Sequence, residues 1–217
     1  MSQQRVLVYG AGGHGKVVVD ILERMGRYEI AGIVDDDHQG KGLRFLGYPI
    51  LGGLDTLLEH GSQSLLVLAI GDNEARDRLA HRLEPLGFQF VTAVHPTASV
   101  GRDVKLGWGT VVMANVAINS GVTIGRHVIV NTGATIDHDC VIGDFAHISP
   151  GAHLGGGVTV GPLAHVGIGV SVIQDVTIGA RSVIGAGAAV VEDVPPNVTA
   201  VGVPARVVRT RQQGDEA

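Results

Sequence analysis

The chain has 217 residues, a formal net charge of -5 and 16 Lys and Arg, so it shows no basic footprint for nucleic acid and no charge run for a membrane surface. Cys140 is the single cysteine, which excludes an internal disulfide, and residues 1–20 contain neither a cationic n-region nor a long apolar leader. Since no stretch has the roughly twenty apolar residues of a membrane span, we expect a cytoplasmic protein. The chain length fits two domains, which we expect over residues 1–94 and 95–217.

The first domain alternates strands and helices in its sequence pattern. Residues 65–70 are fully apolar, which is typical of a strand buried on both faces of a parallel sheet. The last helix of this domain should bury Ala75, Leu79 and Leu83, which share one face at helical spacing. The pattern predicts a Rossmann-like α/β domain with strands over residues 5–9, 29–34, 65–70 and 88–94 and helices over residues 16–25, 54–59 and 73–86.

The glycine turn after the first strand matches a phosphate-binding pattern. Gly10, Gly12 and Gly15 have the spacing G-x-G-x-x-G between a strand and a helix, and Asp35 follows about twenty residues later. Taken alone, this dinucleotide fingerprint indicates NAD. The physical chemistry requires only a diphosphate on the helix N-terminus and a ribose or base at the acid, so a nucleotide sugar also fits. A tight turn with solvated acidic residues is the structural alternative.

A period of six dominates the second domain. An aliphatic residue returns at every sixth position from Val100 to Val190, and this period fits neither the 3.6 of a helix nor the 2 of a strand. The next residue is often Gly, Asn or Asp, which tolerate tight corners, and a small or β-branched residue comes four positions after the aliphatic one. The pattern predicts a parallel β-helix whose aliphatic residues fill a prism and whose coils stack roughly 4.8 Å apart. We expect a capping strand over residues 198–208.

Polar side chains interrupt the corners of the repeat in segment 131–140. His138 falls on a corner outside the prism beside Asp139, and a neighbouring carboxylate can hold one histidine tautomer and raise its basicity. We interpret His138 as a general base with Asp139 as its orienting group, and a surface pair is the alternative. His147, His153 and His165 share one slot of the repeat. A third ligand is missing, so no metal is expected, and His153 and His165 are placed on a solvated edge.

The hexads, such as Ile-Gly-Arg-His-Val-Ile at 124–129, resemble those of the left-handed β-helix acyltransferases, which implies three hexads per coil. Further motifs resemble the bacterial nucleotide-sugar N-acetyltransferases that act on 4-amino-4,6-dideoxy sugars, with the sialic-acid O-acetyltransferases as close kin. The resemblance covers nearly the whole chain. Its motifs are Gly-Gly-His-Gly-Lys at 12–16, Val-Asp-Asp at 34–36, Ala-Ile-Gly-Asp-Asn-Glu-Ala-Arg at 69–76, His-Pro at 95–96, the segment 131–140 and Gly-Val-Pro-Ala-Arg at 202–206.

This resemblance implies an α/β domain for a nucleotide sugar, followed by an all-β left-handed β-helix for the cosubstrate acetyl-CoA. It gives His138 the role of base and Asp139 the supporting role. Whether Asp at position 139 reaches the ring as well as a Glu, which is one methylene longer, stays open. The residues implied to contact the nucleotide sugar are Gly12, Gly13, His14, Asp35, Asp36, Gly71 and Asn131. Those implied to contact acetyl-CoA are His147, the backbone of Gly156 as an oxyanion donor, Ile168 and Ala186.

A closed homotrimer is the assembly that the resemblance implies, with active sites in the clefts between neighbouring coils. Flat faces with small side chains would pack well against one another. The residues expected on these outer faces include Ala146, Ala152, Thr159 and Ala164.

We interpret the chain as an acetyl-CoA-dependent N-acetyltransferase acting on a UDP- or GDP-linked 4-amino-4,6-dideoxy sugar, without a metal or a covalent intermediate. The alternatives are O-acetylation of a sialic acid, a noncatalytic sugar-nucleotide scaffold and an NAD oxidoreductase. The cluster of Asp137, His138 and Asp139 disfavours a scaffold. A solid aliphatic prism offers no second pocket for hydride transfer, which disfavours the oxidoreductase.

Overall fold

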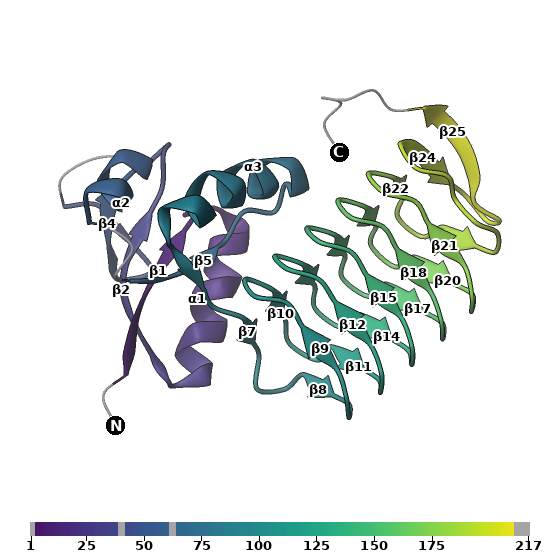
Figure 1. Cartoon of the computed structure of the whole chain (residues 1–217), viewed down its shortest axis with the longest axis horizontal. Helices are drawn as coiled ribbons and strands as arrows, with labels where there is room; N and C mark the ends of the chain where they lie inside the picture. The colour runs from purple at the N-terminus through teal and green to yellow at the C-terminus, as the bar shows by residue number, and fades with distance from the viewer. Residues whose placement is uncertain (1–2, 39–41, 61–63, 211–217) are drawn as a thin grey trace. The chain divides into compact units, whose positions relative to one another are not determined.

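The computed structural model describes residues 3–38, 42–60 and 64–210. The chain forms two compact units, Met1–Pro96 and Thr97–Ala217, each with its own buried apolar core (Figure 1). The first unit is α/β and the second is a left-handed parallel β-helix, as the sequence predicts. Among the described residues, no helix has both the length and the apolar character needed to cross a membrane.

The N-terminal unit is built on a six-stranded sheet with the order β3-β4-β2-β1-β5-β6. Its neighbouring strands are parallel except in the antiparallel pair β3 and β4. The strands are β1 (Gln4–Tyr9), β2 (Tyr28–Val34), β3 (Arg44–Phe45), β4 (Tyr48–Gly52), β5 (Leu65–Leu68) and β6 (Gln89–Phe90), and the short β7 (Ala93–Val94) follows. The helices are α1 (Gly13–Met25), α2 (Leu54–His60) and α3 (Asn73–Leu83), with a 3₁₀ turn η1 (Glu84–Leu86) after α3.

The glycine turn between β1 and α1 depends on close backbone approach. Gly12 is the N-cap of α1, so the helix begins three residues earlier than the sequence pattern predicts. Gly10 has φ 118°, and a Cβ there would lie 2.6 Å from the carbonyl oxygen of Ala69. A Cβ on Gly15 would collide with the carbonyl of Gly10. Both glycines are therefore required for packing the turn against α1 and the end of β5.

Helix α3 buries a different face from the one expected. Its buried residues are Asn73, Arg76, Ala80 and Leu83, whereas the expected Ala75 and Leu79 are only partly covered. The reason is Arg76, which is 1% exposed and donates hydrogen bonds to the carbonyl groups of residues 70–72 after β5. A polar residue satisfied by backbone acceptors thus occupies a core position that hydrophobic periodicity assigns to apolar side chains.

The C-terminal unit stacks coils of three two-residue strands (Figure 1). Residues eighteen apart pair in parallel register, as in Ile129 with His147 and His147 with His165. The second residue of each strand belongs to the period-six series and points into the prism, so the coil buries a continuous aliphatic column.

Three sheets form the faces of the prism. The first contains β8 (Ser99–Val100), β11 (Ala117–Ile118), β14 (Thr135–Ile136), β17 (His153–Leu154), β20 (Ser171–Val172) and β23 (Ala189–Val190). The second contains β9 (Lys105–Leu106), β12 (Thr123–Ile124), β15 (Val141–Ile142), β18 (Thr159–Val160) and β21 (Thr177–Ile178). The third includes β10 (Val111–Val112), β13 (Ile129–Val130), β16 (His147–Ile148), β19 (His165–Val166) and β22 (Val183–Ile184).

The corners of the coil use the left-handed backbone region at a fixed position. From Asp103 to Gly187, every sixth residue has φ between 52° and 77°, and each lies three positions after an aliphatic core residue. The glycines directly after the core residues, which the sequence suggests for the corner itself, serve another purpose. A Cβ on Gly143 would lie 2.5 Å from the backbone nitrogen of Pro162 in the next coil. Those glycines let successive coils approach closely.

The small residues expected on the outer faces lie mostly inside the prism. Ala146, Ala152 and Ala164 are each 0% exposed, so this part of the expectation is wrong, while Thr159 lies on a strand and is partly exposed. Two positions of each hexad point inward, the aliphatic residue and the small residue four positions later, because both sides of a narrow corner must be filled. In most strands of the prism the first residue is instead partly or fully exposed, whereas Val111 and Ile129 are buried.

The coil ends in a hairpin. Strand β24 (Val198–Val201) pairs in parallel with β22, and β25 (Arg206–Thr210) pairs antiparallel with β24. The single capping strand predicted over residues 198–208 is therefore two strands, because Gly202 and Pro204 fall within it and form a turn. Val198 and Ala200 are buried, and they cover the end of the prism.

Candidate active site

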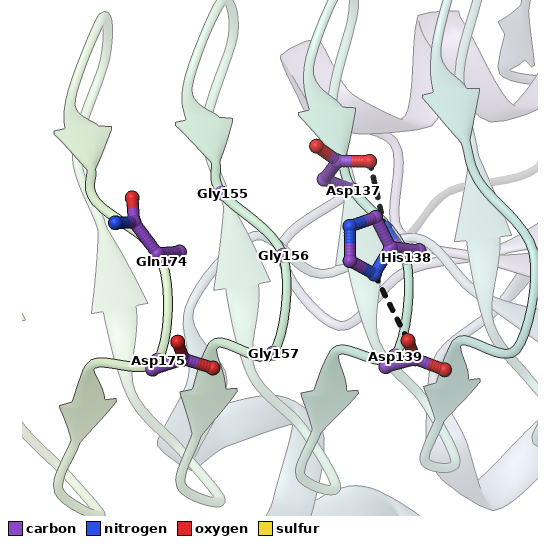
Figure 2. Close-up of a pocket in the computed structure, with 8 residues that line it drawn as sticks. All are labelled: Asp137, His138, Asp139, Gly155, Gly156, Gly157, Gln174 and Asp175. Carbon is purple, nitrogen blue, oxygen red and sulfur yellow. Dashed lines mark hydrogen bonds and ion pairs between the residues drawn. The ribbon is translucent and has the colours of Figure 1, made fainter.

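His138 and Asp139 form a hydrogen-bonded pair on the corner between β14 and β15. The left-handed φ of 60° at Asp139 turns its carboxylate back toward the preceding ring, and Oδ2 lies 2.9 Å from Nδ1 of His138. The shorter Asp therefore reaches the ring. The backbone amide of His138 donates to Oδ1 of Asp137 at 2.8 Å (Figure 2). Asn119 donates to the same oxygen at 2.7 Å. A carboxylate at Nδ1 holds the proton there and leaves the lone pair on Nε2.

The charges around His138 favour its protonated form. The hydrogen bond to Asp139 and the negative charge of Asp137 raise the pKa of His138 above its usual value. Both side chains of the pair are exposed, 64% for His138 and 74% for Asp139, so bulk water reaches them. The arrangement provides a base that is stronger than an isolated histidine and accessible to a substrate proton.

A pocket of about 400 Å³ opens beside this pair. Its floor is the glycine run 155–157, and a Cβ on Gly156 would lie 2.6 Å from Cε1 and 2.7 Å from Nε2 of His138. The imidazole therefore lies directly against the Gly156 backbone. Gly156 itself is buried, and within residues 64–210 its amide donates to no backbone acceptor. The lining residues are Asp137, His138, Asp139, Gly155, Gly156, Gly157, Gln174 and Asp175.

Asn131 and His147 form a second cluster. Nδ2 of Asn131 lies 3.1 Å from Nε2 of His147. The ring of His147 stacks on that of His165 with centroids 4.8 Å apart, and His165 Nε2 lies 2.9 Å from Oγ of the buried Ser149. The solvated edge expected for His165 is wrong because this ring is stacked and hydrogen-bonded, whereas His153 is exposed as expected.

The remaining residues assigned to acetyl-CoA are exposed. Ile168 is 61% exposed, and Ala186 lies eighteen residues later on the next coil at the same corner. The pocket beside His138 contains neither of them, nor Asn131 or His147. One β-helix therefore presents the candidate residues on two neighbouring corners and one face of the prism.

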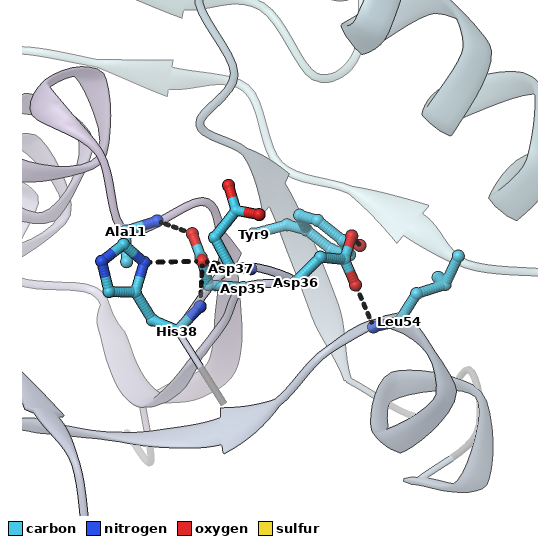
Figure 3. Close-up of polar contacts among 7 residues, drawn as sticks. All are labelled: Tyr9, Ala11, Asp35, Asp36, Asp37, His38 and Leu54. Atoms are coloured by element: carbon cyan, nitrogen blue, oxygen red, sulfur yellow. Dashed lines mark hydrogen bonds and ion pairs between the residues drawn. The ribbon is translucent and has the colours of Figure 1, made fainter. Parts of the chain in front are cut away.

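Asp35 holds the glycine turn to the end of β2 (Figure 3). Its Oδ2 accepts from the Ala11 amide at 2.6 Å, and Oδ1 accepts from the amides of Asp37 at 3.0 Å and His38 at 2.9 Å. Nδ1 of His38 lies 2.8 Å from the same Oδ1. These four contacts give Asp35 a structural part in the turn.

Asp36 borders a cleft. Its Oδ2 accepts from the Tyr9 hydroxyl at 2.5 Å and its Oδ1 from the Leu54 amide at 2.9 Å (Figure 3). Burial and the contact with Asp36 raise the pKa of Tyr9, so the phenol remains the donor. The cleft has a volume of about 280 Å³ and is lined by Asp36, Gly53, Leu54, Asp55, Thr56 and Arg82.

The glycine turn leaves open backbone beside a neutral histidine. A Cβ on Gly12, Gly13 or Gly71 would meet nothing within 4 Å. Burial and the charge of Arg76 lower the pKa of His14 to about 4, so its imidazole is neutral at physiological pH. Its Nε2 is buried and has no hydrogen-bond partner among the described residues. The sequence analysis assigns no role to Arg76, although this residue closes the motif at 69–76.

No metal centre is apparent in the described part of the chain. Residues 3–38, 42–60 and 64–210 contain no group of three or more His, Cys, Asp or Glu side chains arranged to hold a metal ion.

Comparison with known proteins gives one family model and several relatives. Residues 5–83 match the PglD N-terminal domain. The chain is 38% identical over 114 residues to UDP-N-acetylbacillosamine N-acetyltransferase of Bacillus subtilis (strain 168), an alignment over 51% of this chain and 52% of that protein. The match thus spans about half the length of this curated relative.

Solved structures are similar over nearly the full length. A histidine-to-asparagine mutant of perosamine N-acetyltransferase from Caulobacter crescentus, in complex with CoA and GDP-perosamine, is 43% identical with a TM-score of 0.90. The similarity covers 96% of this chain and 98% of that one. The acetyltransferase domain of PglB from Neisseria gonorrhoeae, in complex with acetyl coenzyme A, is 38% identical with a TM-score of 0.87, over 95% of this chain and 100% of that one.

Proposed function

Since this chain belongs to the nucleotide-amino-sugar N-acetyltransferase family, we propose that it transfers the acetyl group of acetyl-CoA to the 4-amino group of a UDP- or GDP-linked 4-amino-4,6-dideoxy sugar. One observation carries the proposal: His138 and Gly156 line one pocket, and Asp139 holds Nδ1 on the far side of the imidazole. A proton acceptor and an oxyanion donor within one pocket are what acyl transfer to an amine requires.

The reaction proceeds by direct attack. The amine of the sugar forms a C–N bond with the thioester carbon while the carbonyl electron pair moves onto oxygen, toward the Gly156 amide. The nitrogen gives its proton to His138 Nε2, and Asp139 stabilises the resulting imidazolium. Collapse of the tetrahedral intermediate breaks the C–S bond, and the departing sulfur takes the proton from His138. The products are the N-acetyl sugar and CoA, and the base is regenerated.

The two ligands are assigned to different parts of the chain. We place the diphosphate on the open backbone of Gly12, Gly13 and Gly71, with His14 beside it and Asp36 toward the base. Asp35 acts indirectly by shaping the turn. The acetyl-CoA site is assigned to His147, Ile168 and Ala186. Asn131, which is assigned to the nucleotide sugar, contacts the ring of His147.

A test of the function compares acceptors. Purified protein with acetyl-CoA is given UDP- and GDP-linked 4-amino-4,6-dideoxy sugars or a free sialic acid, and release of the CoA thiol is followed. We expect turnover with a nucleotide amino sugar and none with the sialic acid. Turnover with the sialic acid alone would replace this proposal by O-acetylation.

We further propose that the protein is a homotrimer. The β-helix of one subunit presents its candidate residues on separate corners, and the β-helix of a neighbouring subunit would complete the site. Light scattering at micromolar concentration is expected to give three times the mass of the chain. A fully active monomer would remove the intersubunit cleft from the mechanism.

The pH dependence of kcat/KM should depend on the hydrogen bond between Asp139 and His138. His138 must be neutral to accept a proton, and Asp139 raises its pKa, so activity is lost as the pH falls through that raised value. Asp139→Asn is expected to lower the pKa of His138 and to move the acidic limb of kcat/KM to lower pH, with a smaller maximum. The profile is measured between roughly pH 5 and 9. Asp103→Asn, at the equivalent corner position two coils earlier, should leave the limb in place.

A further inference from the structure

The pocket beside His138 has the shape of a slot, and its floor is a corner of one coil where no residue has a side chain. The corner of that coil consists of three consecutive glycines, Gly155, Gly156 and Gly157. The preceding coil carries His138 with its two carboxylates, and the following coil carries Gln174 and Asp175 (Figure 2). Adjacent strands lie about 4.8 Å apart, so the two walls are roughly 10 Å apart at the backbone.

Backbone hydrogen bonds fix the spacing of these three coils. Gly157 donates to the carbonyl oxygen of His138 at 2.9 Å, and Asp175 donates to the carbonyl oxygen of Gly156 at 2.9 Å. Both walls are therefore tied to the same glycine floor, and Asp175 cannot shift relative to His138 without breaking this ladder.

The carboxylate of Asp175 leans into the slot. Asp103, Asp139 and Asp175 occupy the same left-handed corner position at intervals of 36 residues, with Gly121 and Gly157 between them. A Cβ on Gly121 would lie 2.7 Å from Oδ1 of Asp139, and a Cβ on Gly157 would collide with Oδ1 of Asp175. The side chains of Asp139 and Asp175 thus fold back over the glycine of the coil before them. This brings the charge of Asp175 to the level of the floor.

This geometry distinguishes two kinds of acceptor. An alkyl amine is protonated at neutral pH and enters the slot as an ammonium, whereas a sugar hydroxyl is neutral. The ammonium loses one proton to water before it attacks, and the nitrogen becomes positive again as the C–N bond forms. A carboxylate facing the base across a slot attracts positive charge in both states, whereas a neutral hydroxyl donates a hydrogen bond to it without the attraction between two opposite charges.

We propose that Asp175 is a specificity-determining residue that selects an amine over a hydroxyl acceptor by binding the positively charged nitrogen from the wall opposite His138. The inference rests on the proposed acetyl transfer and adds the feature that separates N- from O-acetylation. The negative charge of Asp175 also contributes to the raised pKa of His138, which agrees with a carboxylate directed toward the base.

Asp175→Asn is the informative variant because Asn tolerates the left-handed region and has nearly the same shape. Two nucleotide sugars that differ only in an amino or a hydroxyl group at C4 are compared, the first as substrate and the second as competitive inhibitor. We expect the KM of the amino sugar to rise roughly tenfold, since hydrogen bonds to charged groups contribute about that much. The Ki of the hydroxyl sugar should rise less than this, and the KM of acetyl-CoA should stay unchanged.

Asp103→Asn removes the same charge from the same corner geometry outside the slot, and it should change none of these constants. The inference is overturned if Asp175→Asn leaves the KM of the amino sugar unchanged, raises the Ki of the hydroxyl sugar equally, acts on acetyl-CoA instead, or is matched by Asp103→Asn. Absence of transfer by the wild-type protein would instead refute the proposed function, and the inference with it.

Discussion

Replacing His138 by Asn or Ala is expected to lower the turnover of acetyl transfer by roughly 10² to 10⁴, the range that a general base contributes. Either change leaves the substrate amine without a proton acceptor at the moment of attack. The Gly156 backbone and the ligand contacts remain, so the KM values of both substrates should change little. The measurement is thiol release at neutral pH with a nucleotide amino sugar and acetyl-CoA.

The matched control is His153→Asn. His153 is an exposed histidine on the neighbouring face, and its Nδ1 lies 2.8 Å from the Thr135 hydroxyl. Its replacement tests whether losing any surface histidine of the coil affects the rate, and we expect wild-type turnover. If His138→Asn retains near-wild-type turnover, or if both variants lose activity equally, His138 is not the base.

A nucleoside-diphosphate-linked 4-amino sugar is expected to bind with a micromolar Kd, while NAD and NADP bind no tighter than millimolar. This gap corresponds to about 4 kcal/mol and is readily resolved by calorimetry. The reason lies in Asp35, the residue at the position where dinucleotide-binding folds place the acid for the ribose hydroxyls. Its oxygens already accept from the Ala11, Asp37 and His38 amides and contact the His38 ring. The carboxylate that would bind the ribose hydroxyls is therefore already engaged by the turn.

Asp36 supplies the second half of this experiment. Asp36→Asn is expected to weaken binding of the sugar nucleotide and to leave acetyl-CoA binding intact, because the two ligands are assigned to different units. Asp37→Asn is the control, since Asp37 is an exposed carboxylate in the same turn. Tight NAD binding by the wild-type protein, or loss of acetyl-CoA binding in Asp36→Asn, would contradict this division of ligands.

The β-helix could be predicted because every coil repeats the same environment. An aliphatic residue recurs wherever the chain meets the prism, so the period appears in the sequence without knowledge of any contact. The period alone does not tell which other positions face inward, and Ala146, Ala152 and Ala164 were therefore assigned to the wrong side. Small side chains suit both a narrow interior corner and a flat exterior face.

The candidate site was only partly predictable for a related reason. The pair His138 and Asp139 is adjacent in sequence, so its geometry follows from local spacing. Gln174 and Asp175 line the same pocket from two coils further along the chain, and the signal that could have found Asp175 is the interval of 36 residues shared by three aspartates. The buried face of α3 was mistaken because the backbone carbonyl groups that satisfy Arg76 leave no trace in a hydrophobicity pattern.

The glycine floor of the slot has a consequence for how such a protein can change. The outward-facing side chains at the corners contribute little to the column inside the prism, so the outer surface can change one coil at a time while the interior stays the same. A cavity here arises from omitting side chains on one coil, and its walls are whichever residues the two flanking coils carry. Equivalent outward positions recur once per coil, every eighteen residues, so a site can be changed one coil at a time. New acceptor specificities can evolve by substitution alone, without insertion, deletion or a change of fold.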